Sequence, residues 1–107
     1  MSLKTLTKDI QKVSQSYTKH FGITPTSDWY ILKLQEELGE LIQSYLMMIG
    51  QARRKDKTDE ELADNFRKEI ADVFCHVLLL AQHHNVDLEK EVDEKWRVWL
   101  KPGSGQK

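Results

Sequence analysis

Residues 34–48 have the sequence Leu-Gln-Glu-Glu-Leu-Gly-Glu-Leu-Ile-Gln-Ser-Tyr-Leu-Met-Met, and this stretch decides the fold class. Its apolar positions alternate at spacings of four and three residues, a pattern that already begins at Tyr30 and is typical of one packed face of an α-helix. Thr26 or Ser27 can cap the start of this helix, and Gly50 can end it. The predicted packing face consists of Tyr30, Leu34, Leu38, Leu41, Tyr45 and Met48.

Capping residues and glycines mark the ends of three more helices. A helix near the N-terminus ends before Gly22, a residue that readily adopts the left-handed conformation found just after helices. Thr58 with Glu61 forms a capping box, and the charged loop of residues 51–57 precedes it. Asp87 can cap a short last helix. The four predicted helices cover about residues 3–20, 27–49, 59–84 and 88–100.

The length of the chain, 107 residues, is enough for one domain and too short for two. The sequence contains no strand-like alternation of polar and apolar residues and no internal repeat, so we predict an all-α fold. Residues 1–100 are expected to form a single domain, a four-helix bundle-like protomer. Residues 101–107 are polar and contain proline and glycine, so we expect a disordered tail.

The charge balance and the cysteine content narrow the class of protein. The 16 basic and 17 acidic residues nearly cancel, so no basic bias points to nucleic-acid binding. No stretch approaches the roughly 20 apolar residues that span a membrane, and residues 1–9 contain no apolar run suited to a signal peptide. Cys75 is the single cysteine, and its apolar neighbours favour a buried, inert thiol. We therefore expect a soluble, cytoplasmic enzyme or adaptor.

Four carboxylates occupy unusual positions on the second and third predicted helices. At about 100° per residue, Glu37 lies at the edge of the apolar face, with Glu40 one turn further along the same flank. Glu69 lies in the middle of the apolar side of the following helix, and Asp72 lies one turn beyond it. Within each pair, the three-residue separation places both side chains on one helix face, about 5–6 Å apart at Cβ. If the two helices pack antiparallel, the four carboxylates converge.

A divalent cation would explain such a convergence. Four negative charges in a partly buried pocket repel each other and lose hydration, which costs several kcal/mol per ion unless a cation compensates. Mg²⁺ prefers carboxylate oxygens and keeps several waters, which leaves positions for phosphate oxygens; Mn²⁺ is the alternative. A single Glu-x-x-Glu is usually an ordinary surface pair, but two such pairs on consecutive helices favour a metal site.

The two acidic segments, taken in order, resemble a known family signature. Glu36-Glu37-Leu38-Gly39-Glu40 is followed on the next predicted helix by Glu69-Ile70-Ala71-Asp72. This pairing is similar to that of the MazG-like members of the all-α nucleoside-triphosphate pyrophosphohydrolase superfamily, and the likeness extends from about Trp29 to Trp96. It implies Mg²⁺-dependent hydrolysis of a nucleoside triphosphate to the monophosphate and pyrophosphate, with cleaning of the nucleotide pool as the expected role.

The resemblance assigns roles to the individual carboxylates. The implied metal ligands are Glu37, Glu40, Glu69 and Asp72. In-line attack on phosphorus needs a base that takes a proton from the attacking water. Glu36 and Glu40 are the candidates for this catalytic role.

Three further residues are candidates for substrate binding. Lys95 matches a lysine that meets the phosphates in relatives, and His76 falls where relatives often place a residue near the nucleotide. Trp29 could stack on a base, as aromatic side chains do. Packing at a helix end is an equally good interpretation of Trp29, and a histidine satisfied within the protein is the common alternative for His76.

Two other classes of protein fit parts of this pattern. A di-iron carboxylate bundle uses Glu-x-x-His motifs, whereas the third residue after Glu40 is Gln43 and the third after Glu69 is Asp72. A non-catalytic helical oligomer or regulator that keeps the metal site is the stronger rival, and an assay separates it from an enzyme. The base and sugar preference stays open.

Apolar residues lie on more than one side of the second predicted helix. Ile31, Leu32, Leu46 and Ile49 fall outside its predicted packing face. A short bundle covers one such face, and exposed apolar area beyond a few hundred Å² usually marks an interface. We therefore predict a homodimer or a homotetramer, with a nucleoside triphosphate as the other partner.

Overall fold

The computed structural model describes residues 1–100 and 102. Within these residues the chain is helical and contains no strand, so the predicted all-α class is confirmed. The tail that was predicted to be disordered lies outside the described residues, apart from Pro102. The elements in chain order are α1 (Leu3–His20), α2 (Ser27–Met48), α3 (Asp59–His83), α4 (Leu88–Lys95) and the 3₁₀ helix η1 (Arg97–Leu100).

The helix ends lie where the capping residues predict them. Thr26 accepts a hydrogen bond from a backbone N–H in the first turn of α2. Thr58 and Glu61 form the predicted capping box of α3. Gly22 and Gly50, just beyond α1 and α2, have φ angles of 66° and 80°. Glycine adopts this left-handed conformation without steric penalty, which is why both helices end there.

The last predicted helix differs from the structure in its second half. Asp87 caps α4 as predicted, by accepting a hydrogen bond from the Lys90 backbone N–H. The α-helix ends at Lys95, and the chain continues as the 3₁₀ helix η1. Tight 3₁₀ turns are common at helix ends. The periodicity of the sequence does not distinguish such a turn from one more α-helical turn.

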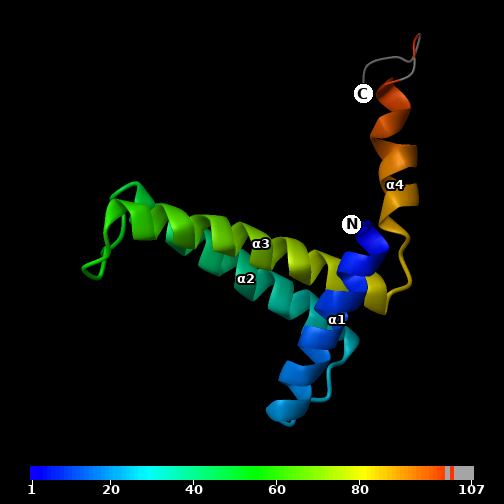
Figure 1. Cartoon of the computed structure of the whole chain (residues 1–107), viewed down its shortest axis with the longest axis horizontal. Coiled ribbons are helices and arrows are strands. Elements are labelled where there is room, and N and C mark those ends of the chain that lie inside the picture. The colour runs from blue at the N-terminus through cyan, green and yellow to red at the C-terminus, as the bar shows by residue number, and fades with distance from the viewer. Residues whose placement is uncertain (101, 103–107) are drawn as a thin grey trace.

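The helices α2 and α3 form an antiparallel hairpin, and their contact is the most extensive between elements of the chain (Figure 1). The helix α1 crosses the open end of this hairpin and packs mainly against α3. In contrast, α4 points away from the hairpin. The described part of one chain therefore does not close into a four-helix bundle. None of its helices combines the length and apolar character needed to cross a membrane.

The packing face of α2 is rotated relative to the predicted one. Leu38 and Tyr45, which were expected to pack in a helix contact, are each 46 % exposed. Ser44 and Met47 are buried instead. A serine side chain is small enough to allow close approach of α3, and its hydroxyl donates to a backbone carbonyl oxygen one turn earlier at 2.7 Å. The rotation brings Glu37 closer to the helix contact than the edge position that was predicted.

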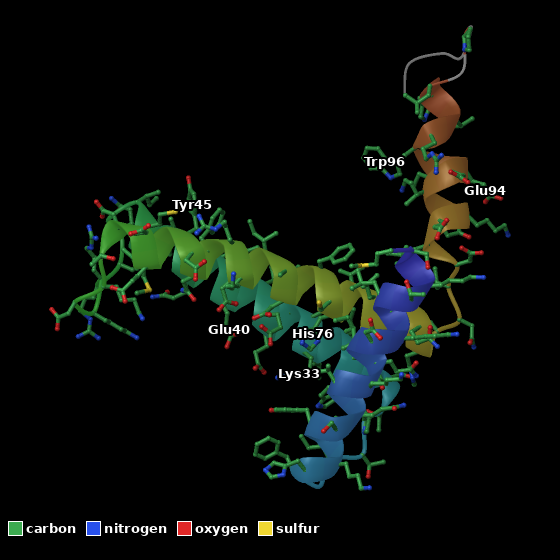
Figure 2. The ribbon with its side chains drawn as sticks, viewed as in Figure 1. Lys33, Glu40, Tyr45, His76, Glu94 and Trp96 are labelled. Atoms are coloured by element: carbon green, nitrogen blue, oxygen red, sulfur yellow. The ribbon has the colours of Figure 1, made fainter. Side chains whose placement is uncertain are left out.

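The side chains that this rotation leaves outside form an apolar face on one side of the hairpin. The rings of Tyr45 on α2 and Phe66 on α3 lie 5.8 Å apart, so the two helices contribute side by side. Four-residue steps continue the line on α3 to Ile70 and Phe74. Figure 2 shows Tyr45 and Glu40 on opposite sides of the hairpin. The exposed members of the apolar face are Ile31, Leu38, Ile42 and Tyr45 on α2, Ile49 just beyond its C-terminal end, and Ile70 and Phe74 on α3.

Candidate metal centre

Three carboxylates meet where α2 and α3 lie side by side. Glu37 and Glu40 are one turn apart on α2, and Glu69 reaches them from α3. One oxygen atom from each of these residues lies within 4.8 Å of the other two. Divalent cations bind oxygen ligands at roughly 2.0–2.6 Å, so two ligands of one ion lie at most about 5 Å apart, and small movements of these side chains would bring the three oxygens around a single ion. We call Glu37, Glu40 and Glu69 the carboxylate cluster.

Two oxygen atoms of the carboxylate cluster are buried without a partner. The Glu37 side chain is only 13 % exposed. Glu37 Oε2 and Glu69 Oε2 are shielded from solvent and accept no hydrogen bond within the part of the chain that the structure describes. Buried polar atoms in native proteins are nearly always paired, and an unpaired one costs about 1–3 kcal/mol. The two helices therefore hold acceptor atoms that a ligand could satisfy.

Burial and mutual repulsion make two members of the carboxylate cluster, Glu37 and Glu69, difficult to ionise. Burial, together with the adjacent carboxyl groups of Glu40 and Asp72, raises the pKa of Glu37 to about 7. Burial also raises the pKa of Glu69, again with contributions from Asp72 and Glu40. The charge of Lys33 lowers the pKa of Glu37 but does not outweigh these effects. A bound cation would favour the ionised forms and oppose the shifts.

Asp72 lies beside the carboxylate cluster and is not one of the three residues with clustered oxygens. Its side chain is exposed, and its charge raises the pKa of both Glu37 and Glu69. Glu40 is exposed as well. Each helix thus contributes one shielded and one exposed carboxylate. The site is open on the exposed side, where a second molecule can reach it.

His76 lies directly against Glu37. Its Nε2 atom is 3.6 Å from Glu37 Oε1, which is too long for a strong hydrogen bond. The imidazole is 17 % exposed, and Nδ1 is buried with no partner among the described residues. Burial lowers the pKa of His76, and the charge of Lys33 lowers it further. The ring is therefore mostly neutral at neutral pH, with one nitrogen able to donate and the other to accept.

A pocket of about 400 Å³ lies beside the carboxylate cluster, between α1 and the hairpin. Trp29 and His76, two of the predicted substrate-binding residues, both line it. The Trp29 ring also meets Tyr30 edge to face, with centroids 5.1 Å apart. Glu37 and Asp72 lie on the ionisable side of the pocket. Its apolar side is formed by Ile10, Val13, Tyr17, Trp29, Cys75 and Leu79.

The half-buried Cys75 in this pocket behaves as the sequence indicates. Burial raises the pKa of its thiol, and the charge of Asp72 raises it further. The thiolate is the reactive form of cysteine. Cys75 is therefore a neutral thiol that contributes apolar surface to the pocket.

Glu36, a predicted base, faces solvent and is paired with a lysine. The ammonium group of Lys33 donates a hydrogen bond to Glu36 Oε1 at 3.0 Å. Sequence reasoning missed Lys33, although a signal was present. Lys33 precedes Glu37 by four residues and Glu36 by three, and such positions share a helix face. A lysine one turn before two glutamates therefore belongs to the same site.

Lys95 is the predicted site residue that one chain does not bring to the carboxylate cluster. It is the exposed last residue of α4. Figure 2 shows the neighbouring residues Glu94 and Trp96 well apart from Glu40 and His76. Within the described residues, α4 points in another direction, so Lys95 lies far from the carboxylates of its own chain.

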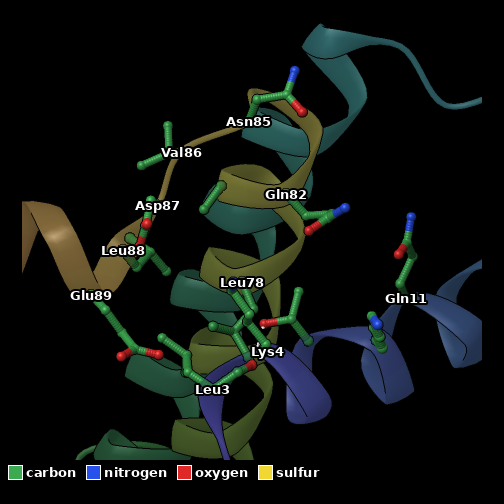
Figure 3. Close-up of a pocket in the computed structure, with 13 residues that line it drawn as sticks. Leu3, Lys4, Gln11, Leu78, Gln82, Asn85, Val86, Asp87, Leu88 and Glu89 are labelled. Carbon is green, nitrogen blue, oxygen red and sulfur yellow. Dashed lines mark hydrogen bonds between the residues drawn. The ribbon is translucent and has the colours of Figure 1, made fainter.

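A second pocket, of about 520 Å³, lies between the start of α1, the end of α3 and the start of α4 (Figure 3). Leu3, Leu78 and Leu88 line it with apolar side chains. Its two acidic residues are Asp87, which caps α4, and the exposed Glu89. The carboxylates that line this pocket do not cluster as those beside the first pocket do. The smaller pocket, next to the carboxylate cluster, is therefore the better candidate for a binding site.

Comparison with known proteins does not assign the chain to a family, so its classification rests on its fold and its site. No family model, curated protein or solved structure matches the chain. The described residues define an all-helical protein with a carboxylate cluster between two long helices. The pocket next to the cluster has one apolar side and one ionisable side.

Proposed function

We propose that the protein is a Mg²⁺-dependent nucleoside-triphosphate pyrophosphohydrolase of the MazG-like type, with Mn²⁺ as an alternative cation. It would convert an NTP or dNTP and water to the nucleoside monophosphate and pyrophosphate. The observation that carries this proposal is the carboxylate cluster, whose two buried oxygens have no hydrogen-bond partner among the described residues. The order of the two acidic segments, similar to that of the MazG-like signature, supports the reaction class.

The donor set of the site suits a hard divalent cation. Each residue of the carboxylate cluster offers carboxylate oxygens, which Mg²⁺ and Mn²⁺ prefer over nitrogen or sulfur. Asp72 is close enough to shift the pKa values of Glu37 and Glu69, and its exposed side chain can turn toward the ion as a fourth ligand. When bound, the cation would neutralise phosphate charge and activate water.

One of two exposed glutamates, within the cluster or beside it, supplies the base. The oxygen of water forms a bond to the α-phosphorus, and the bond from that phosphorus to the bridging oxygen breaks. The electron pair of the broken bond leaves with pyrophosphate. Glu40, within the cluster, or Glu36, beside it, accepts the proton that the water loses. Glu40 is the better placed of the two, because Glu36 is hydrogen-bonded to Lys33.

The neighbouring pocket suits the nucleoside part of the substrate. Small-molecule sites are mostly apolar with a few polar groups that fix orientation. Trp29 offers a ring on which a base can stack, and His76 offers both a donor and an acceptor. The triphosphate would then extend toward Glu37 and Asp72 on the ionisable side of the pocket.

We also propose that the active form is a homodimer or a homotetramer. A folded monomer of 12.6 kDa exposes roughly 6,200 Å² and has a radius of gyration near 13 Å at this length. This chain exposes 8368 Å² and has a radius of gyration of 17.2 Å. The excess in exposed area is larger than the roughly 800 Å² per partner that a stable interface removes.

A second copy of the chain is the partner that suits the apolar face. On α2 the face follows steps of four and three residues from Ile31 to Ile49, with Gln35 as its one polar position. Helices of two chains interdigitate with this spacing. Pairing of two hairpins would complete a bundle that one chain leaves open. It would also allow Lys95 of one subunit to reach the site of the other.

A substrate screen tests the proposed reaction. Purified protein with Mg²⁺ is offered each standard NTP and dNTP, and release of pyrophosphate is measured. Phosphorus NMR should show a monophosphate and pyrophosphate as the first products; orthophosphate as the first product would reject the assignment. Binding of Mn²⁺ without turnover of any substrate would instead favour the second candidate function, a non-catalytic helical oligomer with a metal site.

A further inference from the structure

Lys33 is the one lysine among the described residues that is not exposed. Its side chain retains 21 % exposure, whereas that of Lys68, on α3, retains 73 %. Lysine side chains usually keep the ammonium group in water, because desolvating it is costly. The partly buried position of Lys33 therefore requires a compensating interaction, which a solvated surface lysine does not need.

Lys33 lines the pocket and is also paired with a neighbouring carboxylate outside the pocket lining. Nζ donates to Glu36 Oε1 at 3.0 Å, and the side chain lines the pocket together with Glu37 and His76. Figure 2 shows Lys33 and His76 close together on the side of the hairpin where Glu40 lies. An ammonium group has three N–H donors. One described hydrogen bond goes to Glu36, which leaves two donors for a ligand in the pocket.

The charge on Lys33 persists despite its partial burial. Burial lowers the pKa of Lys33, but the hydrogen bond to Glu36 and the charge of that carboxylate outweigh it, so the pKa is raised overall. Lys33 could pair with the exposed Glu36 without lining the pocket, so this pairing alone does not explain the position of the lysine. The chain thus maintains a fixed positive charge on the ionisable side of an otherwise acidic pocket.

We propose that Lys33 binds the phosphate chain of the substrate where the apolar side of the pocket meets the carboxylates. This inference rests on the proposed function and deepens it by naming an in-chain contact for the anionic part of the substrate. The compact ammonium group offers two donors to phosphate oxygens and a positive charge that complements the cation held by the carboxylates. Lys95 cannot take this role within one subunit, because α4 points away.

Steady-state kinetics of Lys33→Gln, with Lys68→Gln as the matched control, test this role. Lys68 is paired with Asp64 on the exposed side of α3, at 3.5 Å. Loss of a charge-assisted hydrogen bond should raise KM for the triphosphate by about tenfold or more in Lys33→Gln, and Lys33→Arg should restore part of the loss. The control should keep the KM of the wild type. Values within about twofold of the wild type for Lys33→Gln would overturn the inference.

A binding measurement separates phosphate contact from a purely structural role. Lys33→Gln should bind Mn²⁺ at least as well as the wild type, because removal of a nearby positive charge favours a second cation. Its melting temperature should stay close to that of the wild type. Loss of Mn²⁺ binding or a large loss of thermal stability would show that Lys33 holds the helix surface together, and would overturn the inference. If the wild-type protein hydrolyses no triphosphate, the proposed function and this inference are both wrong. If the wild type is active and Lys33→Gln keeps its KM, only this inference is wrong.

Discussion

Glu37 Oε1 on α2 lies 3.6 Å from His76 Nε2 on α3. In an ion pair the pKa of the carboxyl group falls and that of the imidazole rises, whereas here each pKa shifts the other way. Burial raises the pKa of Glu37 to about 7 and lowers that of His76. Near neutral pH in the metal-free protein, Glu37 is therefore about half protonated and His76 is mostly neutral. The Glu37 carboxyl group therefore ionises readily once a cation binds beside it.

The first prediction concerns the stability of the metal-free protein. A carboxyl group with a raised pKa in the folded state binds protons more tightly there than in the unfolded chain, so its contribution to stability falls as pH rises from about 4.5 to about 7. Glu37→Gln removes this effect. In EDTA, the variant should melt at a temperature similar to that of the wild type near pH 5 and at a higher temperature near pH 8.

His76 also titrates in this pH range, and it is present in both the wild type and Glu37→Gln. The quantity to measure is therefore the difference in melting temperature between these two proteins. An exposed residue on the same hairpin, Glu60, supplies the control. The difference between Glu60→Gln and the wild type should not change with pH. A pH-independent difference for Glu37→Gln as well would argue against a raised pKa for Glu37.

The second prediction concerns competition between protons and the metal. A cation binds the ionised carboxylates, so below the pKa of Glu37 it must displace a proton. Affinity for Mn²⁺ should rise with pH between about 6 and 8, by up to about tenfold per unit where Glu37 is protonated. Isothermal titration calorimetry at several pH values measures it directly. A constant affinity over this range would exclude Glu37 from the ligand set.

The third prediction concerns the carboxylates themselves. Each of the substitutions Glu37→Gln, Glu40→Gln, Glu69→Gln and Asp72→Asn should lower turnover by at least about 100-fold, because each removes a charged oxygen ligand. Circular dichroism should show that the helices persist, and Glu60→Gln should keep full activity. Full turnover in any two of the four variants would mean that the cation, if one acts, is held elsewhere.

The fourth prediction concerns the apolar face. Ile42 lies in this face and is half exposed in the single chain, whereas the adjacent Gln43 lies outside it. Ile42→Lys should shift the protein toward monomers in light scattering, since burying an unpaired charge in an interface is unfavourable. Gln43→Lys should leave the assembly unchanged. A wild-type species that is monodisperse near 12.6 kDa and fully active would show that one chain builds the site alone.

The sequence predicts the helices of this protein better than their arrangement. Caps and left-handed residues act locally, so Thr58, Gly22 and Gly50 locate helix ends without knowledge of the partner elements. Which side of α2 meets α3 depends instead on side-chain fit between two helices. The apolar spacing alone therefore selected Leu38 and Tyr45, whereas close packing at Ser44 favours the neighbouring side.

The candidate site shows the same division. Helical spacing brings Glu37 and Glu40 to one flank of α2, and the antiparallel return of α3 adds Glu69, as the sequence predicts. The direction of α4 could not be predicted, because few contacts outside η1 fix it and its periodicity does not reveal where it points. Lys95 was assigned by resemblance and lies apart from the carboxylates of its own chain.

The connection between α2 and α3 has a consequence for how the protein forms. Residues 49–58 connect α2 and α3, two helices that are consecutive in the chain, and helical proteins rich in local contacts fold rapidly. The hairpin can therefore form within a single chain soon after synthesis, while the proposed pairing of two hairpins would be a bimolecular step. At low concentration that second step becomes the slow one. Recovery of activity after dilution from denaturant should then lag behind recovery of helix content, and the lag should shorten as protein concentration rises.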